Sequence, residues 1–156
     1  MTKIYVDLDG VLADHLGEYE RRFGEKIRTN NVHWKNVASV DRWFFNLPLT
    51  PDAHILIDYL KSHPYGFEVL TATGNDYEDV SQQKRDWCLL KFGLPASQVN
   101  TVKSGVDKAV YVKTKYDILV DDTPKVIAAW IAAGGTGILH TSAEDTIKQL
   151  NALSQR

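Results

Sequence analysis

The stretch KIYVDLDGVLAD, residues Lys3–Asp14, places an apolar run directly before two carboxylates. Residues 4–6 have the β-branched and aromatic side chains that are typical of a buried strand, and Asp7 and Asp9 follow with one residue between them. Side chains two positions apart on a strand point to the same side. We therefore expect the two acids to face each other and to raise each other's pKa, an arrangement that is costly unless a cation or a reaction makes use of it.

The composition favours a single globular domain and excludes several kinds of partner. The 156 residues include 44% hydrophobic and 24% charged residues, which is typical of soluble globular proteins. A net charge of −2 offers no basic surface for duplex nucleic acid, and no apolar run reaches the roughly 18 residues that a membrane helix needs. Cys88 is the single cysteine, and no signal-peptide pattern precedes the first strand, so we expect one domain over residues 1–156 in the cytoplasm. The oligomeric state stays open.

Strand-like and helix-like segments alternate along the chain. Strands that alternate with helices of ten or more residues predict right-handed βαβ units, and therefore an α/β fold whose parallel sheet is covered by helices on both faces. The expected strands are 3–7, 67–71, 98–103, 116–121 and 136–140, and the expected helices are 11–23, 51–62, 76–92, 124–133 and 143–154.

One segment interrupts this alternation. Residues 24–49 form a connection far longer than the usual 2–6 residues, and they carry four aromatic residues, Trp34, Trp43, Phe44 and Phe45. A segment this aromatic is not expected to be disordered. Together with the preceding helix we interpret residues 15–49 as a small helical cap. The aromatic residues either form the core of the cap or stack on a nucleobase.

Polar side chains gather at the ends of several predicted strands. Ligands of open parallel sheets bind beyond the carboxyl ends of the strands, so these residues should meet at one edge. Acids so close together call for a divalent cation, and carboxylate oxygens without a histidine or cysteine cluster favour Mg²⁺ over zinc. The residues are Asp7 and Asp9, Thr71, Lys108, and the pair Asp121 and Asp122.

The order of these residues resembles the four motifs of haloacid dehalogenase-like phosphatases. The matching parts are DLDGVL (7–12), Thr71, Lys108 and the acidic pair 121–122. Within that superfamily the chain is similar to the 5'(3')-deoxyribonucleotidases, through the stretches DLDGVLAD, FFNLPLTPDA, KRDWCLLKFG and DKAVYVKTKYDILVDD. The resemblance implies a Rossmann-like three-layer α/β/α core with the cap inserted after the first strand. It also implies Mg²⁺-dependent hydrolysis of phosphate monoesters through a phosphoaspartate.

The resemblance also assigns a role to each residue. Asp7 would attack phosphorus, and Asp9 would protonate the leaving alkoxide and then activate water. Thr71 would bind a phosphoryl oxygen, and Lys108 would offset negative charge. Mg²⁺ would be held by Asp7, the backbone carbonyl of Asp9, and either Asp121 or Asp122. The substrate-binding residues would be His15, Trp34, Phe44, Phe45, Ala72 and Thr73, where His15 stands in place of an aromatic residue that encloses the base.

Several alternatives remain at this point. Extra residues separate Lys108 from the acidic pair, so Lys103, Lys113 and Lys115 are alternatives for the lysine. The resemblance favours a nucleoside or deoxynucleoside 5'-monophosphate as substrate, and the alternative is a sugar phosphate or a nucleic-acid 3'-phosphate. A remote alternative is a phosphorylatable receiver module, which also gathers acids, a hydroxyl and a lysine around Mg²⁺. The position of the acidic pair after the lysine argues against it.

Overall fold

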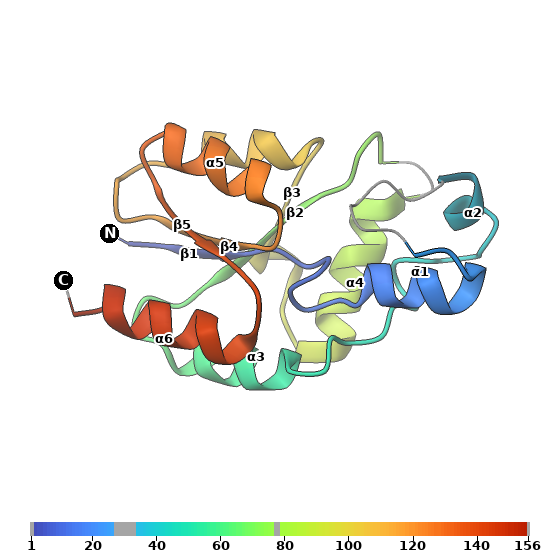
Figure 1. Ribbon diagram of the computed structural model, residues 1–156, viewed down its shortest axis with the longest axis horizontal. Helices are drawn as coiled ribbons and strands as arrows, with labels where there is room; N and C mark the ends of the chain where they lie inside the picture. The colour runs from blue at the N-terminus through green and yellow to red at the C-terminus, as the bar shows by residue number, and fades with distance from the viewer. Residues whose placement is uncertain (1, 27–33, 77–78, 156) are drawn as a thin grey trace.

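The computed structural model describes residues 2–26, 34–76 and 79–155, and it confirms the predicted alternation of strands and helices (Figure 1). Each predicted strand is present with bounds that differ by at most a few residues. The elements in chain order are β1 (Ile4–Val6), α1 (His15–Phe23), α2 (Trp34–Ala38), α3 (Ala53–Ser62), β2 (Glu68–Ala72), α4 (Val80–Phe92), η2 (Ala96–Gln98), β3 (Val99–Val102), η3 (Gly105–Tyr111), β4 (Ile118–Asp121), α5 (Pro124–Ala132), β5 (Thr136–Leu139) and α6 (Ala143–Leu153).

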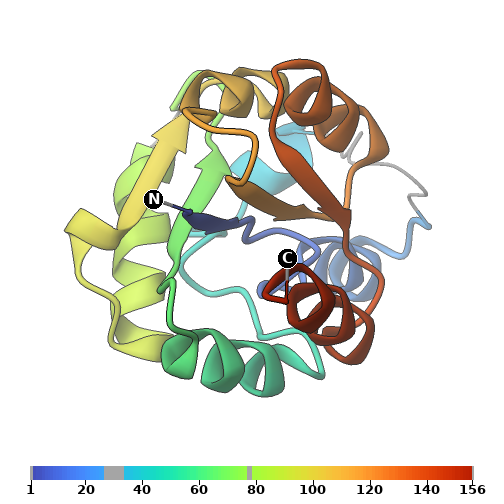
Figure 2. The same cartoon turned by 90° about the vertical axis from the view of Figure 1, so that its left-hand side faces the viewer.

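The five strands form one parallel sheet in the order β3-β2-β1-β4-β5, with β1 at its centre (Figure 2). Val6 of β1 pairs with Val69 of β2 on one side and with Val120 of β4 on the other. Strands β2 and β3 follow β1 on one side of it, and β4 and β5 lie on its other side. The strand order therefore reverses at β1, and α/β sheets bind their ligands at such a switch point.

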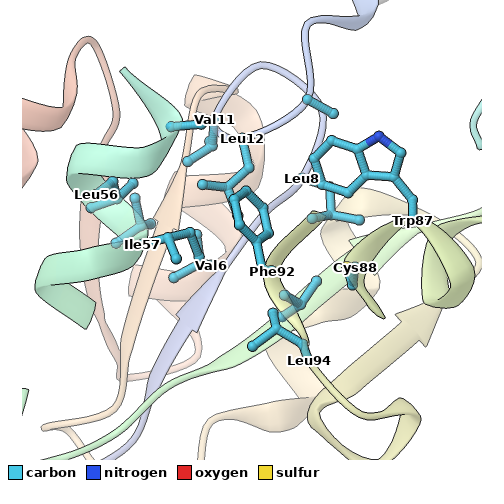
Figure 3. Close-up of a cluster of buried hydrophobic side chains, with 14 of the residues drawn as sticks. Val6, Leu8, Val11, Leu12, Leu56, Ile57, Trp87, Cys88, Phe92 and Leu94 are labelled. Atoms are coloured by element: carbon cyan, nitrogen blue, oxygen red, sulfur yellow. The ribbon is translucent and has the colours of Figure 1, made fainter. Parts of the chain in front are cut away.

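Both faces of the sheet are buried, because successive strand residues alternate between two hydrophobic clusters. Ile4 and Val6 belong to the cluster that α3, α4 and α6 complete, while Tyr5 belongs to the cluster of α5. Figure 3 shows the first cluster, where Val6 and Phe92 lie among side chains from the helices. The sheet thus has helices on both faces, as Figure 1 shows with α5 on one side and α3 and α6 on the other.

Two helices begin four residues later than the sequence predicts. The helix expected from residue 11 begins at His15, because the carbonyl of Leu8 accepts the amides of residues 11, 12 and 13 and closes a tight turn first. Asp14 then caps α1 by accepting the amide of Gly17. The helix expected from residue 76 begins at Val80. Within the described ranges, none of the helices combines the length and the apolar character needed to cross a membrane.

The segment between residues 14 and 49 leaves the core and returns to it at the same place. The amide of Asp14 donates to the carbonyl of Pro48 at 2.9 Å, and the amide of Thr50 donates to the carbonyl of Leu12 at 2.9 Å. An antiparallel bridge joins Ala13 to Leu49. The segment carries α1 and α2 beyond the end of the sheet, as Figure 1 shows at its right-hand side. This attachment fixes where the aromatic side chains of the segment stand relative to the strand ends.

Asp117 anchors the opposite, amino end of β4. Its buried carboxylate accepts the amides of Lys3 at 3.1 Å, Lys113 at 2.9 Å and Thr114 at 2.8 Å. Its carbonyl accepts the indole N–H of Trp130 at 3.1 Å. One side chain therefore joins the start of β1 to the loop that enters β4.

We expect Asp117→Ala to lower the free energy of unfolding by about 2–4 kcal/mol, because three backbone N–H groups lose their acceptor in a buried place. Asp117→Asn should cost less, since one oxygen remains. Urea denaturation measures both changes. The control Asp58→Ala removes an exposed acid of α3 and should change stability by less than about 0.5 kcal/mol. Equal stabilities of Asp117→Ala and the control would contradict the anchoring role.

Candidate active site

The site begins where β1 and β4 end side by side. The amide of Asp7 donates to the carbonyl of Val120 at 2.9 Å, which continues the pairing of the two strands. Asp7 therefore lies beside Asp121, and Asp122 follows on the same edge. Oxygens of these three carboxylates lie within 4.8 Å of one another. The structure thus brings together three of the acids that the sequence places at strand ends.

Lys108 lies between two of these acids. Its ammonium group is 2.9 Å from Oδ1 of Asp7 and 2.7 Å from Oδ2 of Asp121, and the lysine is buried. Ser104 and Asp107 position it, because they form a capping box at the start of η3. Burial opposes the charge of Lys108, but the two carboxylates outweigh burial and raise its pKa.

The alternative lysines lie elsewhere. Lys103 is exposed at the rim of the cavity in front of Asp7, and Lys113 and Lys115 are exposed in the loop that enters β4 from its amino end. Of these four lysines, only Lys108 contacts the acids at the strand ends within the residues that the structure describes.

Burial and mutual repulsion act on the acids themselves. Burial raises the pKa of Asp7 well above its usual range, the charge of Asp121 raises it further, and Lys108 opposes both effects. Burial and the charge of Asp121 likewise raise the pKa of Asp122 to about 6. Both groups hold negative charge at an energetic cost, which a bound cation would remove.

Some carboxylate oxygens of Asp7, Asp121 and Asp122 accept hydrogen bonds from the described residues and others do not. Lys108 and the amide of Thr123 bind both oxygens of Asp121, and the hydroxyl of Thr123 binds Oδ1 of Asp122. From the residues that the structure describes, Oδ2 of Asp7 and Oδ2 of Asp122 accept no hydrogen bond. Gly10, with a φ of 85°, lies against Asp122, because a Cβ at this position would overlap the carboxylate. Oδ2 of Asp7 and Oδ2 of Asp122 are therefore open to a hard cation that prefers oxygen ligands, and each engaged carboxylate oxygen keeps a second lone pair for such a cation.

Lys84 is a site residue that the sequence analysis missed. Its ammonium group lies 3.0 Å from Oδ2 of Asp9, 2.8 Å from Oγ1 of Thr71 and 2.9 Å from the carbonyl of Ala72. These three contacts use all three N–H groups of the ammonium. Lys84 is buried at the start of α4 and joins the end of β2 to the loop after β1.

The sequence predicts a raised pKa for Asp9 because Asp7 lies close to it. This prediction is wrong, and Lys84 is the main reason. Burial acts to raise the pKa of Asp9, but the charges of Lys84 and His15 and the hydrogen bond from Lys84 outweigh it, and the pKa is lowered. Asp7 and Asp9 thus each lie beside a different lysine. The two acids have opposite shifts, with the pKa of Asp7 raised and that of Asp9 lowered.

Two adjoining cavities open onto these groups. A cavity of about 290 Å³ contains Asp7, Asp9 and both buried lysines in its wall. A second one, of about 490 Å³, has a largely apolar wall and shares Trp34 and Phe44 with the first. Of the predicted substrate-binding residues, the structure brings His15, Trp34, Phe44, Ala72 and Thr73 to the first cavity. Phe45 lines neither cavity and instead packs against the guanidinium of Arg42, 4.2 Å from the ring centre.

Comparison with protein-family models and with curated protein sequences finds no match. Solved structures do match. A haloacid dehalogenase-like family hydrolase from Xanthomonas campestris covers 99% of this chain and 96% of its own, with a TM-score of 0.67 and 10% identity. L-2-haloacid dehalogenase from Xanthobacter autotrophicus covers 97% of this chain and 83% of its own, with a TM-score of 0.59 and 13% identity. A HAD family hydrolase from Deinococcus radiodurans R1, with bound phosphate and sodium, covers 96% and 88%, with a TM-score of 0.54 and 13% identity.

These likenesses extend over nearly the whole chain, although few residues are identical. The chain therefore has the α/β fold of haloacid dehalogenase-like hydrolases, as the order of its motifs implied.

Proposed function

We propose that the chain is a Mg²⁺-dependent phosphomonoesterase in which Asp7 attacks phosphorus and carries the phosphoryl group as an aspartyl-phosphate. The environment of Asp7 carries the proposal. Lys108 binds its Oδ1, whereas Oδ2 accepts no hydrogen bond from the described residues, and Asp7 lines the cavity. A carboxylate with one oxygen held and the other facing a cavity is suited to in-line attack on a bound phosphate ester.

The donor set fits Mg²⁺. Asp7, Asp121 and Asp122 would hold the ion together with the backbone carbonyl of Asp9, because all of them offer the oxygen ligands that Mg²⁺ prefers. When bound, Mg²⁺ supplies positive charge that offsets the acids and the phosphoryl oxygens. Lys108 contributes a second positive charge, because it contacts both Asp7 and Asp121.

Thr71 and Lys84 would position the phosphoryl group. Lys84 donates to Oγ1 of Thr71, so the hydroxyl of Thr71 keeps its own proton for another acceptor. Thr71 is buried at the end of β2, next to the cavity wall that Ala72 forms. A phosphoryl oxygen in the cavity is the acceptor that we assign to this hydroxyl.

Asp9 would be the general acid of the first step and the general base of the second. It protonates the leaving alcohol and then takes a proton from the water that hydrolyses the aspartyl-phosphate. Lys84 favours ionised Asp9 before the substrate binds, which is the state that the second step requires. A phosphoryl group beside Asp9 brings negative charge that opposes Lys84, and this raises the pKa of Asp9 toward the protonated state of the first step.

The substrate that we assign is a deoxynucleoside 5'-monophosphate. Segment 14–49 would act as the cap, and the apolar cavity that it walls adjoins the phosphate cavity. Trp34 is 59% exposed and lines both cavities, so its ring is available to a ligand. Stacking of a base on an aromatic ring contributes about 1–3 kcal/mol. A sugar phosphate, which has no base, would leave this apolar wall unused.

A second candidate reaction is hydrolysis of a carbon–halogen bond, because one of the structural neighbours is an L-2-haloacid dehalogenase. An aspartate nucleophile would serve that reaction too. The cluster of Asp7, Asp121 and Asp122 favours phosphate esters, since a cation site offsets the charge of a phosphoryl dianion and has no comparable role at a neutral carbon–halogen bond. Halide release from L-2-chloropropionate, assayed beside phosphate release, distinguishes the two reactions.

We expect the protein with Mg²⁺ to release phosphate from thymidine 5'-monophosphate with higher kcat/KM than from glucose 6-phosphate. Trp34→Ala should raise KM for the nucleotide by roughly 5- to 150-fold, the factor that corresponds to the stacking energy. Hydrolysis of p-nitrophenyl phosphate should change little. Asp7→Asn should abolish release from all three esters.

The matched control for Trp34 is Phe45→Ala, which removes an aromatic ring of the same segment outside both cavities. It should leave KM for the nucleotide unchanged. A preference for glucose 6-phosphate, or equal effects of the two variants, would refute the nucleotide assignment. Halide release without phosphate release would refute the phosphatase.

Removal of Mg²⁺ with EDTA should abolish phosphate release, and the stabilisation by Mg²⁺ should depend on pH. Because the pKa of Asp122 is raised to about 6, its carboxyl is protonated below that pH and competes with the cation. In the metal-free protein the raised pKa makes Asp122 lower the free energy of unfolding as pH rises from about 3.8 to about 6, and the loss is complete above the folded value. Mg²⁺ should therefore raise the melting temperature more at about pH 7.5 than at about pH 5. An equal shift at both values, or the same shift in Asp122→Asn, would contradict the cation site.

A further inference from the structure

His15 occupies an unusual place for a histidine, at the start of α1 between the aromatic side chains of segment 14–49. It is 4% exposed. Its ring stacks near Phe44 at 5.5 Å between ring centres and near Trp34 at 6.4 Å, and it meets the edge of Trp43 at 5.9 Å. An apolar ring would satisfy this packing equally well. The polar atoms of His15 therefore need a separate explanation.

One ring nitrogen has a partner that determines the tautomer. The indole N–H of Trp43 lies 3.0 Å from Nδ1 of His15. An indole nitrogen is only a donor, so Nδ1 must accept with its lone pair and the proton of a neutral ring resides on Nε2. Burial and the charge of Lys84 lower the pKa of His15 more than Asp9 and Asp14 raise it, which favours the neutral ring.

The other ring nitrogen faces the cavity. No described residue makes a hydrogen bond with Nε2. Every side-chain nitrogen or oxygen that is fully shielded does have a partner, so Nε2 must reach accessible space. His15 lines the cavity that contains Asp7, Asp9 and Lys84. It also lies close to Asp9, because the charge of each of these two groups shifts the pKa of the other.

The ammonium group of Lys84 cannot replace Nε2 of His15 as a donor without losing one of its own hydrogen bonds. The three N–H groups of Lys84 already bind Asp9, Thr71 and the carbonyl of Ala72. His15 thus offers a neutral donor on the side of Asp9, where the leaving alcohol stands in the proposed reaction. A neutral donor suits an uncharged oxygen better than a phosphoryl dianion, which charged groups bind more strongly.

We propose that His15 is a substrate-binding residue whose Nε2–H donates to an uncharged oxygen of the leaving alcohol, close to the scissile ester oxygen. The inference rests on the proposed phosphatase function and is independent of the base. It requires a substrate whose leaving alcohol carries a ring or hydroxyl oxygen within a few bonds of the ester, as in phosphate esters of sugars and nucleosides. Simple aryl phosphates lack such an oxygen. Trp43 is then a positioning residue, because it selects the tautomer that presents Nε2–H.

Two substitutions separate the functions of the two ring nitrogens. His15→Asn keeps an oxygen acceptor near the position of Nδ1 for Trp43 and removes the donor at Nε2. His15→Gln keeps an amide donor near Nε2 and removes the acceptor for Trp43. With thymidine 5'-monophosphate, His15→Asn should lower kcat/KM by roughly 3- to 10-fold, the value of one neutral hydrogen bond, and His15→Gln should restore at least half of the loss. With p-nitrophenyl phosphate the loss in His15→Asn should be clearly smaller than with the nucleotide.

Equal losses on both substrates would overturn the inference, because they would mean that His15 acts on Asp9 and not on the leaving group. No loss on either substrate would overturn it as well. The absence of phosphate release by the wild-type protein would instead refute the proposed function, and a second measurement then decides the role of His15.

That measurement is the NMR spectrum of the histidine ring nitrogens in Asp7→Asn, which is expected to bind substrate without turnover. We expect the Nε2-protonated pattern for His15, its loss in Trp43→Phe, and a shift of the Nε2 resonance when thymidine 5'-monophosphate is added. An Nδ1-protonated ring, or an Nε2 resonance that does not respond to the nucleotide, would overturn the inference.

Discussion

Repulsion among three close carboxylates, of which Asp7 and Asp121 are buried and Asp122 is half-buried, is the constraint on which the site depends. Because Val6 pairs with Val120, Asp7 and Asp121 become neighbours as soon as β1 and β4 pair, and Asp122 follows. In a buried place such repulsion is strong, since little water screens it. Lys108 of η3 offsets part of this repulsion, because its ammonium group lies 2.9 Å from Asp7 and 2.7 Å from Asp121. A bound cation would offset the remaining charge. Burial and the charge of Asp121 keep the pKa of Asp7 high in the absence of a cation.

The two lysines give the two acids of the first motif different properties. Lys108 contacts Asp7 and Asp121, and Lys84 contacts Asp9 and Thr71 at the end of β2. An acid that attacks phosphorus and an acid that exchanges protons with an alcohol need different environments. Burial and the charge of Asp121 outweigh Lys108 and raise the pKa of Asp7, whereas Lys84 and His15 outweigh burial and lower the pKa of Asp9.

The strands were predictable because each is a short apolar run, and the acids were predictable because each follows such a run. Lys84 was not predicted, because a lysine in a helix is normally solvated. A signal was nevertheless present: Lys84, Trp87 and Cys88 occupy positions i, i+3 and i+4, so the lysine shares the buried face of α4. Phe44 and Phe45 could not be separated by sequence, since only the fold of segment 14–49 decides which ring lines the cavity and which packs on Arg42.

The central claim is that Asp7 carries the phosphoryl group, and trapping of the intermediate tests it most directly. In Asp9→Asn the intermediate should form from p-nitrophenyl phosphate, whose leaving group needs little protonation, and should persist because water is no longer activated. Acid quenching followed by borohydride reduction converts an aspartyl-phosphate into homoserine, which mass spectrometry of the peptide locates. The account requires homoserine at position 7. An unmodified Asp7 in a variant that still shows a burst of p-nitrophenol, or a phosphoryl group on another residue, would contradict it.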